Sequence, residues 1–410
     1  MKKRHGVLLL LVALAIITFL DRISIAVAGP RIQQELRIPP ERWGWVLGAF
    51  VLAYGIFEVP TGALGDRAGQ GRVLTRIVLW WSAFTSLTGL ATGYTGLLIT
   101  RFLFGVGEAG AYPNMSGALA RWFPATERAR AQGFIWAASR LGGALTPLLV
   151  VPLQSLLGWR VTFGILGAIG AVWAAGWRLW YHDRPAAQPG ITQQELDEIA
   201  GRAAPLSHPG VPWGELLRQR QLWLIFAMYW CYAWGSWFYF GWFPVYLMKG
   251  AGFSETQMGV FSALPFLLGT CGNVAGGFLS DWLAVRFGLK TGRRLIGCTS
   301  LAASALLLAG LTLTHNKAAV VVLSSLGLGV ADLMLPAAWA VCLDVGRDHA
   351  GVVTGTMNTA GQFGGFVCSV LFGYVVKATG GYSAPLGLIA AMVAVAAFLF
   401  TRIDPTRPLV

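Results

Sequence analysis

The stretch Gly62-Ala-Leu-Gly-Asp66-Arg67-Ala-Gly69-Gln-Gly-Arg72 is a short polar segment between two long apolar runs. Its glycines allow two helices to approach closely, and its charged side chains can pair across a tight connection. A degenerate copy, Gly277-Phe-Leu-Ser-Asp281 followed by Arg293-Arg294, stands between two later apolar runs. A polar hairpin that recurs between apolar runs indicates a duplicated set of membrane helices.

The composition also indicates a chain that folds in lipid. Of its 410 residues, 55% are hydrophobic and only 12% are charged, whereas an average soluble domain has about 25% charged residues. The formal charge of +13 could suggest nucleic-acid binding. However, the basic residues stand at the ends of apolar runs, as they do in cytoplasmic loops of membrane proteins. We therefore predict an all-α integral membrane protein that has the lipid bilayer, and no nucleic acid, as a partner.

Twelve apolar runs are long enough to cross a bilayer as helices, which takes about 20 residues each. A basic flank without a convincing cleavage site precedes the first run, so we expect a retained helix rather than a signal peptide. With an even number of spans, both termini are then cytoplasmic, and the excess of basic residues on the inside flanks agrees. The predicted spans are residues 7–28, 43–64, 74–93, 96–118, 131–153, 159–181, 221–247, 257–280, 294–313, 319–343, 350–376 and 383–402.

Residues 182–220 form the one long hydrophilic stretch between these spans. They divide the chain into a six-helix bundle at 1–181 and a second at 221–410. Both halves carry charged connections at similar offsets, which predicts a parallel duplication of the kind found in transporters. A non-transporting membrane sensor would need a further signalling domain, and we expect no room for one in this linker or in the short tails.

The motif at residues 62–72 resembles the cytoplasmic loop motif of the major facilitator superfamily. The resemblance implies a twelve-helix fold of two bundles that alternately opens to either side of the membrane. It also implies that the motif acts as a conformational latch and does not contact the substrate. The latch residues would be Gly62, Asp66, Arg67, Gly69 and Arg72, with Asp281 in the second copy.

Charged residues inside the spans are the strongest sign of function, because burying one in a bilayer costs about 2.5–3.5 kcal/mol. Asp21 and Arg22 lie in the first span, and Arg101 and Glu108 lie in the fourth. Helical rise places the first three at a similar depth and Glu108 roughly 10 Å deeper. A purely structural ion-pair network is one explanation, but buried pairs stabilise poorly. We favour a site where arginines bind an anion and a desolvated carboxylate takes up a proton.

Phe19-Leu-Asp21-Arg22, together with the string from Arg101 through Glu108 to Tyr112-Pro113, resembles the anion:cation symporter branch of that superfamily. This branch includes bacterial galactonate, hexuronate and glucarate permeases and animal sialic acid, glutamate and phosphate carriers. The resemblance implies proton coupling by Asp21 and Glu108, and anion binding by Arg22 and Arg101. Further substrate contacts would be Tyr54, Trp339 and Asn358, with Gln362 one helical turn beyond Asn358. Ala337-Ala338 stand where hydroxyl residues often do, which leaves the sugar acid unspecified.

Two residues leave alternatives open. Arg140 in the fifth span is either a third anion-binding cation or a structural partner of Glu108. Trp234, in the unusually aromatic seventh span, either lines the cavity or packs in the core. None of the five cysteines has metal-ligand spacing, so we expect buried free thiols and no metal site.

We therefore predict proton-coupled symport of a small organic anion by alternating access. A hexonate or hexuronate is the favoured cargo, and the setting is the inner membrane of a bacterium. The carrier would be a monomer, driven by the proton gradient without a cofactor. Two alternatives remain, a symporter of aromatic carboxylates and a proton-coupled drug exporter, although two intramembrane arginines disfavour cationic drugs. No phosphate-binding loop or nucleophile–base arrangement occurs, so we expect no enzyme activity.

Overall fold

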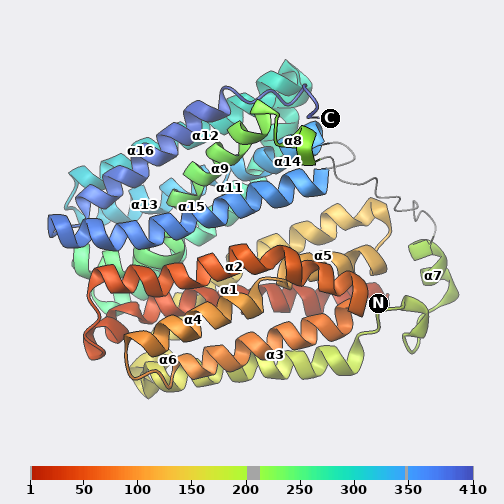
Figure 1. Cartoon of the computed structure of the whole chain (residues 1–410), viewed down its shortest axis with the longest axis horizontal. Helices are drawn as coiled ribbons and strands as arrows, with labels where there is room; N and C mark the ends of the chain where they lie inside the picture. Colours follow the sequence, from red (N-terminus) through yellow and green to blue (C-terminus); the bar gives the residue numbers. More distant parts are fainter. Residues whose placement is uncertain (1, 201–212, 347–349, 410) are drawn as a thin grey trace. The chain divides into compact units, whose positions relative to one another are not determined.

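The computed structural model describes residues 2–200, 213–346 and 350–409, which are mostly helical (Figure 1). The chain forms two compact units, residues 1–24 with 52–207 and residues 25–51 with 208–410. The boundary between the units passes through the first helix and the second helix. The C-terminal end of the first and the N-terminal end of the second, on either side of their connecting turn, belong to the second unit. The predicted division at 1–181, 182–220 and 221–410 stays a prediction.

The helices of the first half occupy the predicted spans, with one difference. The predicted span 96–118 is two half-helices that are interrupted at Ala109 and Gly110. Spans five and six are two helices, as predicted, and they meet at a kink at Gly158, where φ is 78°. The elements are α1 Lys3–Glu35, α2 Pro40–Ala68, α3 Gln70–Thr88, α4 Tyr94–Glu108, α5 Ala111–Trp122, α6 Ala125–Trp180, η1 Pro185–Ala187 and α7 Gln193–Ala200.

The second half has the same kind of interruption in its fourth span. Residues 332 and 333 separate two half-helices within the predicted span 319–343. The predicted seventh span includes two π-helical turns. The elements are α8 Trp213–Leu216, α9 Arg220–Trp237, η2 Phe238–Trp242, α10 Phe243–Val245, η3 Tyr246–Gly250, α11 Glu255–Phe287, α12 Leu289–Leu313, α13 Lys317–Ala331, α14 Met334–Gly346, α15 Ala350–Thr379 and α16 Ser383–Phe400.

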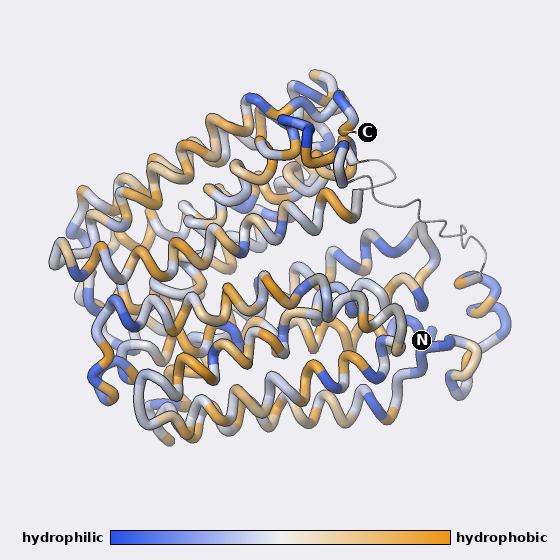
Figure 2. The backbone as a smooth tube through the Cα atoms, viewed as in Figure 1, coloured by the Kyte–Doolittle hydropathy of each residue, from blue (hydrophilic) through white to orange (hydrophobic). Residues whose placement is uncertain are grey.

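Apolar residues run along these helices, and hydrophilic residues gather around α7 and the N-terminus (Figure 2). Seven helical segments within the described residues are long and apolar enough to cross a membrane, judged by length and composition. One of them, Arg130–Trp180, contains two predicted spans. Each predicted span therefore corresponds to a helix, a pair of half-helices or one arm of α6.

The interrupted helices reveal the duplication in the structure itself. The half-helices α4 and α13 begin 223 residues apart, and so do α5 and α14. When two halves of a chain are a parallel repeat, a helix break in one half is expected to recur at a constant sequence offset in the other.

Glycines allow close contacts between helix backbones within each unit. A methyl group on Gly142 of α6 would come within 2.6 Å of the Ile16 carbonyl oxygen on α1. In the second unit, one on Gly272 of α11 would come within 2.0 Å of the Gly329 carbonyl oxygen on α13. Such contacts between backbones are a common means of packing membrane helices, because lipid tails leave little hydrophobic force to drive their association.

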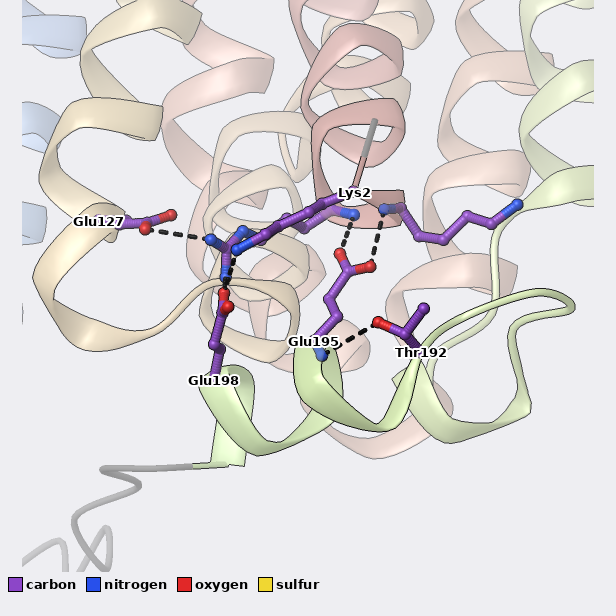
Figure 3. A network of polar contacts seen from close by, with 7 residues as sticks. Lys2, Glu127, Thr192, Glu195 and Glu198 are labelled. Atoms are coloured by element: carbon purple, nitrogen blue, oxygen red, sulfur yellow. Dashed lines mark hydrogen bonds and ion pairs between the residues drawn. The ribbon is translucent and has the colours of Figure 1, made fainter.

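The helix α7, in the predicted linker, is fixed to the start of α1 (Figure 3). The carboxylate of Glu195 accepts hydrogen bonds from the backbone N–H groups of Lys3, at 3.0 Å, and Arg4, at 2.9 Å. The buried Arg4 forms ion pairs with Glu198 on α7 and with Glu127 near the start of α6. The carboxylate thereby satisfies donors that the first turn of α1 leaves open.

Candidate substrate and proton site

A buried ion pair joins α1 to α4 in the first unit. Arg22 donates from Nε to Oε1 of Glu108 at 2.9 Å, and its Nη2 donates to the same oxygen. Glu108 is fully buried, and Arg22 is 8% exposed. The sequence placed these residues at different depths, but their side chains meet in the structure. The other carboxylate oxygen, Oε2, has no hydrogen-bond partner among the described residues.

Aromatic rings surround the guanidinium of Arg22. The ring centres of Phe19 and Tyr54 each lie 5.0 Å from its central carbon. Such cation–π contacts leave the arginine partly paired even when a carboxylate departs. Tyr54, predicted as a substrate contact, thus lies against one of the predicted anion-binding residues.

Asp21 lies beside this pair and is 1% exposed. Neither of its oxygens accepts a well-formed hydrogen bond from the residues that the structure describes, and the indole of Trp81 faces it. Its charged neighbours are Glu108 and Arg101. Burying an ionised carboxylate with so few hydrogen bonds has a large desolvation free energy. Protonation removes the charge and most of that free-energy cost.

Arg101, on α4, is 2% exposed, and its guanidinium lies over the Phe104 ring at 4.3 Å. It acts electrostatically on both Glu108 and Asp21. The four charged residues predicted from the spans are therefore neighbours in one unit. Their roles in proton coupling and anion binding stay predictions.

Arg140, on α6, is 8% exposed and lies near Tyr112 of α5. The Tyr112 hydroxyl is 2.6 Å from the Ser139 hydroxyl, and its ring stacks on Trp136 with 4.9 Å between centroids. Glu108, the predicted structural partner, forms its ion pair with Arg22. Which role Arg140 has stays open.

The predicted contacts of the second unit lie on α14 and α15. Trp339, Asn358 and Gln362 are half-buried, and the latter two are one turn apart on α15. The ring of Trp234, on α9, is buried and 5.5 Å from that of Trp230. Burial agrees with core packing of Trp234, while its alternative role in a cavity stays untested.

The structure describes the surroundings of some of the predicted latch residues but not of all. Gly62 packs toward Pro113, and Gly69 has a φ of 86° just before α3. The side chains of Asp66 and Arg67 lie outside the described residues, and Arg72 is exposed. In the second copy, Arg293 forms ion pairs with Asp281 at 2.9 Å and with Asp344 at 3.5 Å.

The expectation of buried thiols holds for Cys231, Cys342 and Cys368 and is wrong for the other two cysteines. Cys271 is exposed and Cys298 is only half-buried, because they lie on helix faces that the other helices of the unit leave uncovered.

The sequence analysis missed two acids inside predicted spans, the half-buried Glu58 of span 43–64 and the deeply buried Asp332. Asp332, at the break between α13 and α14, is fully buried, and its Oδ1 accepts a hydrogen bond of 3.1 Å from the Tyr232 hydroxyl. Its signal was available, since it is an acidic residue within the predicted span 319–343. By the reasoning applied to Glu108, it is a functional candidate.

The family model described as Major Facilitator Superfamily matches residues 11–369 of this chain. A curated relative from Cupriavidus necator, named a probable sulfoacetate transporter, is 34% identical, and the match covers 98% of this chain and 94% of the relative. A hexuronate transporter of Bacillus subtilis is 30% identical over 98% of this chain and 95% of its own. A probable galactarate/D-glucarate transporter of Escherichia coli is 29% identical over 97% and 92%.

A solved structure also matches the fold. It is a bacterial homologue of the human lysosomal transporter Spinster, in an inward-facing and occupied conformation. The TM-score is 0.81 with 19% identity, over 98% of this chain and 96% of that one. This likeness confirms the predicted all-α, twelve-helix architecture. The names of the relatives describe transporters and not enzymes, as the sequence predicted.

Proposed function

Because this chain belongs to the Major Facilitator Superfamily, we propose that it takes up a small organic anion together with protons. Such multi-pass proteins move their cargo by exposing one central site to each side in turn. The relatives named for sulfoacetate, hexuronate and glucarate support an anionic cargo. The cargo is a sugar acid such as a hexonate or hexuronate, with a small sulfonate as the second candidate.

The ion pair between Arg22 and Glu108 is the observation that carries this proposal. Arginine offers two parallel donors that match a carboxylate or sulfonate. When an incoming anion takes these donors, Glu108 loses its counter-ion in a buried setting. An uncompensated buried carboxylate is costly, so Glu108 binds a proton at the moment the anion binds. Anion and proton are therefore loaded together.

Neighbouring charged and aromatic residues support this replacement of Glu108 by the anion at Arg22. Arg101 acts on both acids and supplies the second positive charge for the cargo. Asp21 is the second acid, held beside Arg101 and Glu108 without a well-formed hydrogen bond among the described residues. The rings of Phe19 and Tyr54 keep the Arg22 guanidinium in place while its partner changes.

The setting follows from the same reasoning. A proton-driven uptake carrier operates in an energised membrane, and we place this one in the bacterial inner membrane with both termini in the cytoplasm. It acts as a monomer and needs no cofactor, since the proton gradient drives it. We retain aromatic carboxylates as the alternative cargo because the seventh span is rich in Trp and Tyr.

A thermal-shift screen on the purified protein tests the cargo. Ligands that bind the folded state raise the melting temperature. The panel holds sulfoacetate, glucuronate, galactonate, glucarate and benzoate, with rhodamine 6G as a cationic drug. We expect a sugar acid or sulfoacetate to stabilise the protein. Stabilisation by rhodamine 6G alone would contradict anion transport.

Transport by proteoliposomes tests the proton role. Glu108→Gln should lose accumulation driven by an inward proton gradient but keep exchange of internal for external anion. Glu215→Gln removes an exposed acid on α8 and should behave as the wild type. Normal accumulation by the Glu108→Gln protein would remove Glu108 from proton coupling.

A further inference from the structure

Asp332 is a buried acid in the second unit that the site around Arg22 does not use. It directly follows α13, which ends at Ala331, and it precedes α14, which begins at Met334. In the first unit, Glu108 is the last residue of α4, and α5 begins at Ala111. Since both pairs of half-helices are related by the same offset of 223 residues, the two acids occupy almost equivalent places in the repeat.

Helix breaks at the midplane are where transporters hold ions and cargo, because backbone groups there are freed from the helix ladder. An ionisable residue inside a span is also a functional candidate by default, given its energetic cost. Asp332 lies at a helix break and inside a predicted span, and it is fully buried. The repeat therefore presents an acid at each of its two breaks.

The surroundings of Asp332 come from three neighbouring elements. Tyr232 on α9 donates its hydroxyl to Oδ1 at 3.1 Å. Tyr239, in η2, is a further titratable group that interacts with the acid. The face of α11 presents glycines, and a methyl group on Gly269 would come within 2.7 Å of Oδ2. Phenols and a glycine-rich helix face are therefore among the neighbours of this acid.

We propose that Asp332 is a second proton-binding site, which loads and releases one proton in each transport cycle. This inference rests on the proposed proton-coupled function. The ionised carboxylate binds a proton at Oδ2, while Tyr232 keeps its hydrogen bond to Oδ1. Release of that proton to the other side returns the carboxylate to its ionised form. Each anion would then be accompanied by one proton more than the site in the first unit supplies.

The test is the number of protons moved per anion. Proteoliposomes are held at zero membrane potential with potassium and valinomycin, and labelled glucuronate or sulfoacetate is accumulated to equilibrium under several pH gradients. The slope of the logarithmic accumulation ratio against the pH gradient gives the stoichiometry. Asp332→Asn should have a slope lower by one, that is, about tenfold less accumulation per pH unit.

The matched control is Asp344→Asn, which removes an acid at the far end of α14 that pairs with Arg293. Its slope should equal that of the wild type. A wild-type slope for Asp332→Asn would overturn the assignment of Asp332 while leaving the proposed function intact. A wild-type protein that ignores the pH gradient would instead refute proton coupling itself, and this inference with it.

A second variant keeps the inference testable if Asp332→Asn does not fold. Tyr232→Phe removes only the hydroxyl that stabilises the ionised carboxylate. The acid should then hold its proton to higher pH, and half-maximal uptake should move upward by about one pH unit. An unchanged pH profile in this variant would contradict a proton site at Asp332.

Discussion

The carboxylate of Asp183 accepts a hydrogen bond of 3.1 Å from the backbone N–H of Gly71, in the first turn of α3. Arg121 lies 3.9 Å from the same oxygen. Asp183 follows α6, more than a hundred residues further along the chain. The polar hairpin at residues 62–72 is therefore tied to the end of the sixth span by an acid at the N-terminus of a helix, where negative charge is favoured.

Removing this contact should destabilise the first unit. We expect Asp183→Ala to lower the free energy of unfolding by about 1 kcal/mol, as loss of a helix cap does. Thermal unfolding in detergent measures it. Asp197→Ala, at an exposed position on α7, should leave the melting temperature unchanged. Equal melting temperatures for Asp183→Ala and the wild type would show that the contact contributes nothing.

The attachment of α7 can be tested separately. Without the carboxylate in Glu195→Ala, the amides of Lys3 and Arg4 lose their acceptor, so their hydrogen exchange should accelerate at least several-fold. Mass spectrometry of the N-terminal peptide measures this rate. Glu198→Ala breaks side-chain ion pairs only and should leave those two amides protected. Unchanged exchange in Glu195→Ala would mean that the cap is not formed in solution.

The C-terminal segment should give a pH-dependent contribution to stability. Burial alone would raise the pKa of Asp404, but hydrogen bonds from Lys290 and Thr406 outweigh it and hold that pKa well below its ordinary value. A lowered pKa means that the contribution is complete above about pH 4 and is lost as the pH falls through the folded-state pKa. Lys290 is half exposed, so we expect about 1 kcal/mol or less.

Melting curves across pH provide the measurement for Asp404. Asp404→Asn should melt below the wild type at pH 7, and the gap should narrow as the pH drops below about 4. Lys290→Met removes the main donor and should flatten this dependence. If the difference in melting temperature between the two proteins widened on acidification, the direction assigned to the pKa shift of Asp404 would be wrong.

Packing between α11 and α13 predicts a strong effect of one methyl group. Gly272→Ala places a carbon 2.0 Å from the backbone oxygen of Gly329, which no side-chain rotation can relieve. Overpacking of this kind costs about 1–3 kcal/mol. Gly277→Ala is the matched control, since its new carbon would have only an ordinary contact with Pro336 at 3.9 Å. Thermal unfolding of the two variants should separate them clearly, and similar melting temperatures would contradict this packing.

Anion affinity tests the role of Arg101. Truncating a buried charge that pairs with a ligand costs about 2–5 kcal/mol. Arg101→Ala should therefore weaken binding of the anion identified in the thermal-shift screen beyond detection by calorimetry. Arg218→Ala, at an exposed position after α8, serves as the control. Unchanged affinity for Arg101→Ala would exclude Arg101 from the site.

Much of the architecture could be predicted because backbone polar groups in a bilayer must be hydrogen-bonded within the protein, which few kinds of secondary structure achieve. Apolar runs of sufficient length dictate helices, and the repeated polar hairpin indicates the duplication. The breaks at Ala109–Gly110 and at residues 332–333 could not be read from hydropathy, since each lies inside a segment whose average hydropathy predicts one unbroken span. By contrast, the turn at Gly158 separates the two arms of α6 that the sequence predicted as separate spans.

The candidate site was predictable only in part. Charge inside a span singled out Arg22 and Glu108, but helical rise alone did not predict that they would pair with each other. The choice of partner depends on side-chain reach and on how α1 packs against α4. The link from Asp183 to Gly71 joins distant parts of the chain, and only the folded structure brings them together.

The π-helical turns of the seventh span have a practical consequence for scanning experiments. A π turn closes on the fifth residue instead of the fourth, so it inserts an extra residue into the helix. Each insertion turns the following side chains by about 100° around the axis. Labelling patterns measured before Phe238 will therefore fall out of phase after Trp242. Reagents that mark one stripe of α9 will mark another flank of the segment from Phe243 onward.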